Sequence, residues 1–240
     1  MSIHDGHRDR LRDQFRDHGL DSFNDLNALE LLLFYAIPRR DTNEIAHALL
    51  DHFGSLHAVF EASEQELCSV PGIGVQAATL LRLFPQMMRK SACSKTTGIR
   101  TIRKSSEAGE YLIPRFLNEQ DEVILLLCLD SQKRIITCVE VGRGVVNASE
   151  TSLRRIVETA LKYKSTFVIL SHNHPDGIAC PSVEDDCMTK QVFRSLMLVG
   201  IHLEDHIVVA WESYASFRDM GMLGPYYIHL FCQLFFVNIS

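Results

Sequence analysis

The hydrophobic pattern of the chain changes character before its middle. From residue 4 to about 90, apolar residues recur at helical spacing, and Gly19, Pro38 and Gly54 separate the segments. The stretch at 91–104, SACSKTTGIRTIRK, has little apolar periodicity and several small or basic residues, which is typical of a linker. We therefore expect an all-helical domain at 1–92, a linker at 93–104 and a second domain at 105–224.

The second domain alternates short apolar runs with amphipathic segments. The runs typical of strands lie at 122–130, 134–141, 166–170 and 202–210, and the polar turn SQKR joins the first two. Segments at 152–163 and 182–199 have the periodicity of helices. This order predicts a sheet flanked by helices, so the second domain belongs to the α/β or α+β class.

Composition adds an expectation about the compartment. The longest apolar runs fall short of the roughly 20 residues that span a bilayer. The first residues, MSIHDGHRDRLRDQF, are charged and lack the apolar segment of a secretory signal. The seven cysteines are odd in number and have no CxxC spacing, so reduced thiols are expected. We expect a cytoplasmic protein without a membrane span.

A glycine hairpin is the candidate nucleic-acid contact. The net charge of −6 would repel a phosphate backbone, so any such contact must come from a local surface. In VPGIG at 70–74, the backbone N–H groups of Gly72, Ile73, Gly74 and Val75 could face a phosphate. Basic residues follow at Lys90, Lys95, Arg100, Arg103 and Lys104. The same hairpin could simply connect two packed helices, and the sequence leaves both readings open.

The candidate chemistry lies in SHNHPDGIACPSVED at 171–185. On a strand, His172 and His174 point to the same side, and a turn followed by a helix can bring Asp185 back towards them. Two imidazoles and one carboxylate suit zinc and leave a fourth position for water. However, Ser182 followed three residues later by Asp185 is also a helix capping box. Spacing alone does not decide between a ligand and a cap. Cys180 and Cys187 flank the motif, but we expect them to be small core or loop residues and not ligands.

Several stretches together resemble one family. HNHPDG and PSVED resemble the HxHPxG and SxxD parts of the JAB/MPN (JAMM) metalloprotease motif, in the form found in the RadC family. Further resemblance lies in residues 140–161, DHIVV and SFRDMG, and upstream in HRDRLRDQF, ALELLLFYAIPRRDT, FGSL and VPGIG, so it covers residues 4–222. The resemblance implies a helical N-terminal domain with a helix-hairpin-helix, followed by a JAB/MPN, cytidine-deaminase-like sheet flanked by helices.

The resemblance also implies residue roles. His172, His174 and Asp185 would hold Zn²⁺, Glu140 would act on the water as general base and acid, and Ser182 would help to hold the oxyanion. The implied reaction is hydrolysis of a peptide or isopeptide bond in a protein or peptide substrate. From the residues alone, Glu140 reads as a solvated strand residue. One departure is Asp176, where related sequences typically carry a serine.

Two other function classes stay open. One is a DNA-binding accessory or repair protein with a non-catalytic metal site, since the family name implies DNA repair. The other is a metal-dependent nuclease, although such enzymes ordinarily use oxygen-rich magnesium or manganese sites. The apolar tail at 225–240 could be an edge strand, a dimer contact or the product of an altered reading frame. A homodimer is a further expectation.

Overall fold

The structure is a computed structural model that describes residues 3–144, 150–175 and 177–226. The chain forms two compact units, Met1–Met88 and Arg89–Ser240. The predictions about the tail therefore lie outside the described residues, apart from Pro225 and Tyr226. None of the helices in the described part of the chain combines the length and apolar character that a membrane span needs.

The first unit is helical throughout, as its pattern predicts. Its helices are α1 (Ile3–His18), α2 (Asp25–Ala36), α3 (Asn43–Phe53), α4 (Leu56–Glu61), α5 (Glu64–Ser69) and the larger part of α6 (Val75–Lys95), which ends in the second unit. The side chains of Asn24, Ser55 and Ser63 cap α2, α4 and α5 by accepting backbone N–H bonds. Buried leucines from α2, α3, α5 and α6 share one core.

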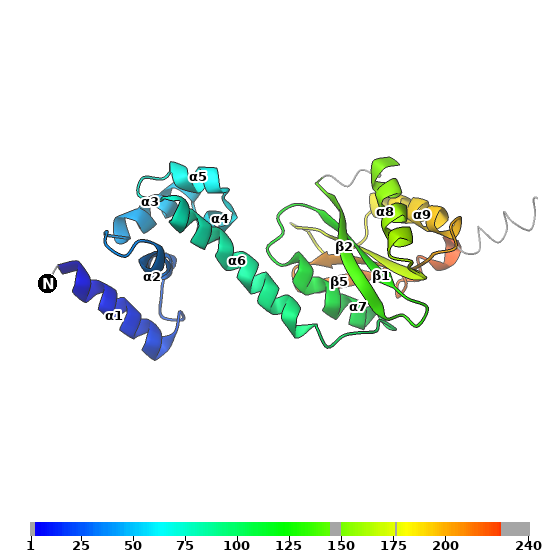
Figure 1. The fold of residues 1–240 in the computed structure, drawn as a ribbon, viewed down its shortest axis with the longest axis horizontal. Helices are drawn as coiled ribbons and strands as arrows, with labels where there is room; N and C mark the ends of the chain where they lie inside the picture. Colours follow the sequence, from blue (N-terminus) through cyan, green and yellow to red (C-terminus); the bar gives the residue numbers. More distant parts are fainter. Residues whose placement is uncertain (1–2, 145–149, 176, 227–240) are drawn as a thin grey trace, which may run out of the picture. The chain divides into compact units, whose positions relative to one another are not determined.

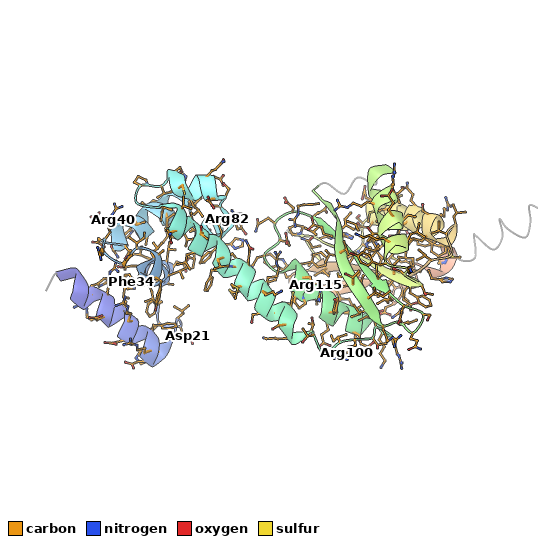
Figure 2. The ribbon with its side chains drawn as sticks, viewed as in Figure 1. Asp21, Phe34, Arg40, Arg82, Arg100 and Arg115 are labelled. Atoms are coloured by element: carbon orange, nitrogen blue, oxygen red, sulfur yellow. The ribbon has the colours of Figure 1, made fainter. Side chains whose placement is uncertain are left out.

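The side chain of Arg8 connects α1 to the C-terminal end of α2 through a cation–π contact and hydrogen bonds. Its guanidinium lies 4.7 Å from the ring centroid of Phe34, which is labelled in Figure 2. The same guanidinium donates hydrogen bonds to the carbonyl oxygens of Ile37 and Pro38, at 2.8 and 2.9 Å. These carbonyls follow a helix C-terminus, where backbone acceptors lack helical partners.

The predicted hairpin joins α5 to α6. Gly72 has a φ of +95°, and a Cβ atom there would lie 2.9 Å from the side chain of Ile45. Ile73 is buried, and its amide donates to the carbonyl oxygen of Val70 at 3.1 Å. A short helix, a tight turn and a long helix are therefore present. Binding of DNA by this turn stays a prediction.

The second unit contains one five-stranded sheet (Figure 1). Its elements are α7 (Ser105–Leu112), η1 (Ile113–Phe116), β1 (Val123–Leu129), β2 (Ile135–Arg143), α8 (Glu150–Lys162), β3 (Phe167–Asn173), α9 (Val183–Met197), β4 (His202–Ala210) and β5 (Ser213–Ser216). The strand order is β2-β1-β3-β4-β5. Among the strands of the described residues, only β3 and β4 pair in parallel, and α9 connects them. The predicted strands and helices are present, and β3 continues to Asn173, beyond its predicted end.

Helices cover both faces of this sheet. Ile124, Leu126 and Cys128 of β1 pack in the same core as residues of α8 and α9. The alternate residues Leu125 and Leu127 pack in a second core with residues of α7 and η1. Figure 1 shows α8 and α9 on one side of the sheet and α7 on the other. Burial on both faces explains why β1 reads as the continuous apolar run VILLLCL.

The region expected as a linker is partly ordered structure. Helix α6 continues to Lys95, so it includes the first residues of 93–104. Ile102 is buried in the core of the second unit, and Thr101 forms a β-bridge with Arg134. Ile99 packs against the same core, and the amide of Ile102 donates to the carbonyl oxygen of Lys133 at 2.9 Å. Two isoleucines and backbone hydrogen bonds hold the segment without a helical or strand-like apolar period.

Candidate metal centre

Strand β3 places the two histidines of the motif together. His172 and His174 alternate with Asn173, so both rings lie on the face of the sheet that α9 covers. Their Nε2 atoms are 3.0 Å apart. The amide of His174 donates to the carbonyl oxygen of Val209 on β4 at 2.8 Å, which extends the strand geometry to this residue. The prediction that a strand aims both imidazoles at one point is confirmed.

Asp185 reaches the same point from the first turn of α9. Its Oδ1 atom is 3.0 Å from Nε2 of His172, and its Oδ2 atom is 3.4 Å from Nε2 of His174. The Ser182 amide donates to Oδ2 at 2.8 Å, and the Ser182 hydroxyl oxygen accepts from the Asp185 amide at 3.0 Å. The capping box is therefore real, and it orients the carboxylate towards the histidines. The capping reading is confirmed, and the ligand reading stays a prediction with which the cap is compatible.

The three side chains form a group that could hold a metal ion. Their candidate ligand atoms all lie within 4.8 Å of one another, and His172 and Asp185 are buried. In a tetrahedral zinc site with bonds of about 2.0–2.1 Å, neighbouring N and O ligands lie about 3.3–3.4 Å apart. The two histidine Nε2 atoms, and Oδ1 of Asp185 with Nε2 of His172, are each 3.0 Å apart, close to that value. The ligand types and these separations thus fit zinc.

The tautomer of His174 is set by its backbone neighbour. Nδ1 of His174 lies 3.2 Å from the carbonyl oxygen of Ile178. A carbonyl oxygen can only accept, so Nδ1 carries the proton and Nε2 presents its lone pair to the group. A ring nitrogen bonded in this way is the usual arrangement of a zinc-binding histidine. The turn after β3 therefore orients His174 as a candidate ligand.

The ionisation states of Asp185 and His206 favour the binding of a cation at the centre. Burial alone would raise the pKa of Asp185, but the hydrogen bond and the charge interaction with His172 outweigh it and hold the pKa well below its usual range. Asp185 is therefore a carboxylate at neutral pH. Burial, reinforced by His172, lowers the pKa of the adjacent His206 well below its ordinary value, so that ring is neutral.

Glu140 occupies a different environment. It lies on β2 opposite Leu125, and its side chain is 43% exposed. Arg143 donates to both oxygens of the Glu140 carboxylate, at 3.1 and 2.8 Å, and this bonding lowers the pKa of Glu140. In this structure the carboxylate is held by Arg143 and not by the histidine–aspartate group. Its exposure agrees with the reading of a solvated strand residue, and the role implied by the resemblance stays a prediction.

No other sequence candidate among the described residues belongs to this histidine–aspartate group. Asp176 is outside the described residues. Cys180 and Cys187 are exposed, and neither belongs to the group of candidate ligands. The hairpin residues Gly72, Ile73, Gly74 and Val75 belong to the first unit, while the candidate metal centre lies in the second.

Sequence reasoning missed two buried polar residues behind the centre. His206 on β4 and Thr189 on α9 are both fully buried. Nδ1 of His172 lies 2.8 Å from Nε2 of His206, whose Nδ1 lies 2.6 Å from the Thr189 hydroxyl. The sequence signal that could have found His206 is its position at the start of the otherwise apolar run HIVVA. The side chains that it contacts depend on the pairing of β3 with β4, which the sequence does not specify.

Comparison with known proteins decides the family. The profile of the RadC-like JAB domain matches residues 102–222, about half of the chain, including all three candidate ligands. The chain belongs to the RadC family. A UPF0758 protein of Saccharophagus degradans is 29% identical over 215 residues, covering 90% of this chain and 96% of that protein. UPF0758 protein FN0909 of Fusobacterium nucleatum subsp. nucleatum is 33% identical over 225 residues, covering 91% and 97%. The RadC resemblance seen in the motifs is thereby confirmed.

Proposed function

We propose that this RadC-family chain is a zinc-dependent hydrolase of peptide or isopeptide bonds. The observation that carries the proposal is the convergence of two imidazole nitrogens and one ionised carboxylate on a single point. Three protein ligands leave a fourth position, which is the arrangement of catalytic zinc sites. A structural zinc site would ordinarily fill all four positions with protein ligands.

The chain's own groups supply the remaining roles. A bound zinc ion would lower the pKa of water to about 7 and polarise a substrate carbonyl. Glu140, which is ionised at neutral pH, would accept a proton from the water and pass it to the leaving amine. The Ser182 oxygen already accepts from the Asp185 amide, and its own O–H would donate to the carbonyl oxygen as negative charge develops there.

Arg143 binds the carboxylate of Glu140, the proposed base, in the absence of substrate. Its guanidinium also donates to Glu119 at 2.7 Å, so it is tied to the segment before β1. When substrate binds, Glu140 would exchange its bonds with Arg143 for a bond to water. The ion pair keeps the Glu140 carboxylate charged until that exchange, because a nearby cation favours the ionised form.

A substrate screen with one matched pair of variants tests the activity. The zinc-loaded protein is incubated with peptide and isopeptide-linked substrates, and released amine is measured. Glu140→Gln should lower kcat by about 10²–10⁴-fold, the usual contribution of a general base. Glu158→Gln, which removes a carboxylate paired with Arg154 on α8, should leave kcat unchanged. Equal rates for wild type and Glu140→Gln would exclude the assigned mechanism.

Association with DNA is the second part of this proposal. The exposed start of α6 at Gly74 and Val75 supports it, since the first N–H groups of a helix have no helical partner and favour an anion. Val75→Pro removes one of these donors at the first helical position, which tolerates proline. We expect this variant to bind a short DNA duplex several-fold more weakly in fluorescence anisotropy. Unchanged binding would leave the hairpin with a purely connecting role.

A further inference from the structure

The single tryptophan of the chain is exposed on the second unit. Trp211 is 75% exposed, whereas Val209 and Ala210 before it are buried. Tryptophan in a folded protein ordinarily buries most of its large apolar area. Among the described residues, no aromatic ring or cation contacts the Trp211 indole. The indole therefore contributes little to the core of this unit.

The backbone at Trp211 has a conformation that suits a smaller residue. Ala210 and Ser213 pair across β4 and β5, so Trp211 and Glu212 form a two-residue hairpin turn. Trp211 has a φ of +53°. Hairpin turns of this length need a positive φ, which Gly, Asn or Asp normally supplies, and a bulky side chain there is a steric outlier. Stability alone would favour another residue, and strain of this kind points to a function.

Strand pairing places this turn beside the candidate metal centre. Strands β3 and β4 are parallel, and Asn173 lies opposite Val209 at their carboxyl ends. His174 follows Asn173 by one residue, and Trp211 follows Val209 by two. Paired strands lie about 4.8 Å apart and rise about 3.3 Å per residue, so the Cα atoms of His174 and Trp211 lie within about 10 Å. In α/β sheets, ligands ordinarily bind at the carboxyl ends of the strands.

A second exposed apolar side chain lies close to the same histidine. Ile178 is 81% exposed. Its main-chain carbonyl oxygen accepts from Nδ1 of His174 at 3.2 Å and from the amide of Cys180 at 2.7 Å. The backbone of Ile178 is thus held against a candidate ligand, while its side chain stays in water. Two exposed apolar side chains, from two different loops, therefore lie near His174.

We propose that Trp211 and Ile178 bind an apolar side chain of the peptide substrate, next to the bond that is cleaved. The inference rests on the proposed function, which supplies the peptide and the bond. Apolar surface is stabilised by leaving water against the indole, and a fixed side chain orients the adjoining main chain near the metal. A cation can also lie over an indole, but Ile178 would desolvate it without offering an acceptor. Leucine should therefore be preferred to lysine.

The residue preference is tested with three acetylated and amidated peptides, Gly-Gly-X-Gly-Gly, in which X is leucine, lysine or glutamine. Backbone amide shifts of the ¹⁵N-labelled full chain give the Kd of each peptide. The emission of the single tryptophan reports whether its indole leaves water on binding. We expect the leucine peptide to bind about tenfold more tightly than the other two and to shift the emission to shorter wavelength.

Substitutions at Trp211 separate binding from stability. Trp211→Gly removes the indole and suits the positive φ, so it should weaken binding of the leucine peptide about tenfold and raise the midpoint of urea unfolding. Trp211→Phe keeps an aromatic ring and should bind within about threefold of wild type. Leu198→Ala, which removes an 87% exposed side chain at the end of α9, should change neither quantity. A lower midpoint with unchanged binding in Trp211→Gly would assign the indole to folding and overturn the proposal.

Hydrolysis in the same samples separates this inference from the proposed function. Leucine-selective binding that Trp211→Gly loses, with no amine released after zinc is added, would support the apolar site and refute the hydrolase. Equal kcat/KM for the leucine and lysine peptides, unchanged in Trp211→Gly, would support the hydrolase and overturn the inference. A lysine preference, or no binding of any peptide, would also overturn it. If Trp211→Gly does not fold, Trp211→Asn makes the same comparison, because asparagine tolerates a positive φ.

Discussion

At Asp185 a helix cap and a candidate metal ligand share one carboxylate. Its Oδ2 atom accepts from the Ser182 amide, and its Oδ1 atom lies 3.0 Å from Nε2 of His172. The cap fixes the carboxylate without a metal, so this candidate ligand is preorganised. A loss at Ser182 should therefore affect both the stability of α9 and the chemistry of the site.

Substitutions of Ser182 can separate these two effects. Ser182→Ala removes the cap and should lower the free energy of unfolding by about 1 kcal/mol, and it also removes the proposed oxyanion donor. Ser182→Asp restores a capping oxygen but has no O–H at neutral pH, so stability should recover while hydrolysis stays low. Urea unfolding and a hydrolysis assay measure the two quantities. Recovery of hydrolysis in Ser182→Asp would contradict the oxyanion role.

Helix α7 lies against β5 at a position that requires glycine. A Cβ atom at Gly109 would lie 2.5 Å from Cδ1 and Cε1 of Tyr214 and 2.9 Å from its Cγ. Gly109→Ala should therefore lower the free energy of unfolding by about 1–2 kcal/mol, because overpacking outweighs the gain of about 1 kcal/mol in helix propensity. Gly98→Ala, where a Cβ meets nothing within 4 Å, is the control. Equal stability of the two variants in urea would contradict this packing.

The start of α7 carries a pH-dependent cap. The amides of Arg103 and Lys104 donate to Glu107 at 2.6 and 3.0 Å, and these bonds lower the pKa of Glu107. A lowered native pKa stabilises the fold above the unfolded value of about 4.3, and the stabilisation is lost as pH falls through the native pKa. At pH 7 the free energy of unfolding of wild type should exceed that of Glu107→Gln by about 0.5 kcal/mol. The difference is small because solvent screens this partly exposed group. Urea unfolding at pH 7 and pH 3 measures the difference. A difference at pH 3 that is no smaller than at pH 7 would contradict the assignment.

The elements differ in how far the sequence could predict them. The run VILLLCL predicts β1 because both of its faces are buried, and the histidine spacing predicts the geometry of His172 and His174. Helix α7 and strand β5 span 8 and 4 residues, too short for a clear period. The contact between His206 and His172 and the ion pair of Glu140 depend on strand register and rotamers. Local pattern does not contain that information.

At the scale of the whole molecule, the chain consists of two compact units with separate cores. Leu49 is fully buried in the first core, and Leu126 is fully buried in the second. Calorimetry should therefore resolve two unfolding transitions. Leu49→Ala should lower the free energy of unfolding of the first unit, and Leu126→Ala that of the second, each by about 2–5 kcal/mol. Zinc at 100 times its Kd should stabilise only the second unit, by about 2.7 kcal/mol. A single transition that responds to both substitutions would contradict independent cores.

The central claim is that His172, His174 and Asp185 hold zinc. Elemental analysis after dialysis without chelator tests it most directly, on wild type, His174→Ala and His202→Ala, the last removing an exposed histidine at the start of β4. We predict about one zinc per chain in wild type and in His202→Ala, and none in His174→Ala, because two remaining ligands hold zinc poorly. Equal zinc in His174→Ala and wild type, or no metal in any of the three folded proteins, would contradict the account.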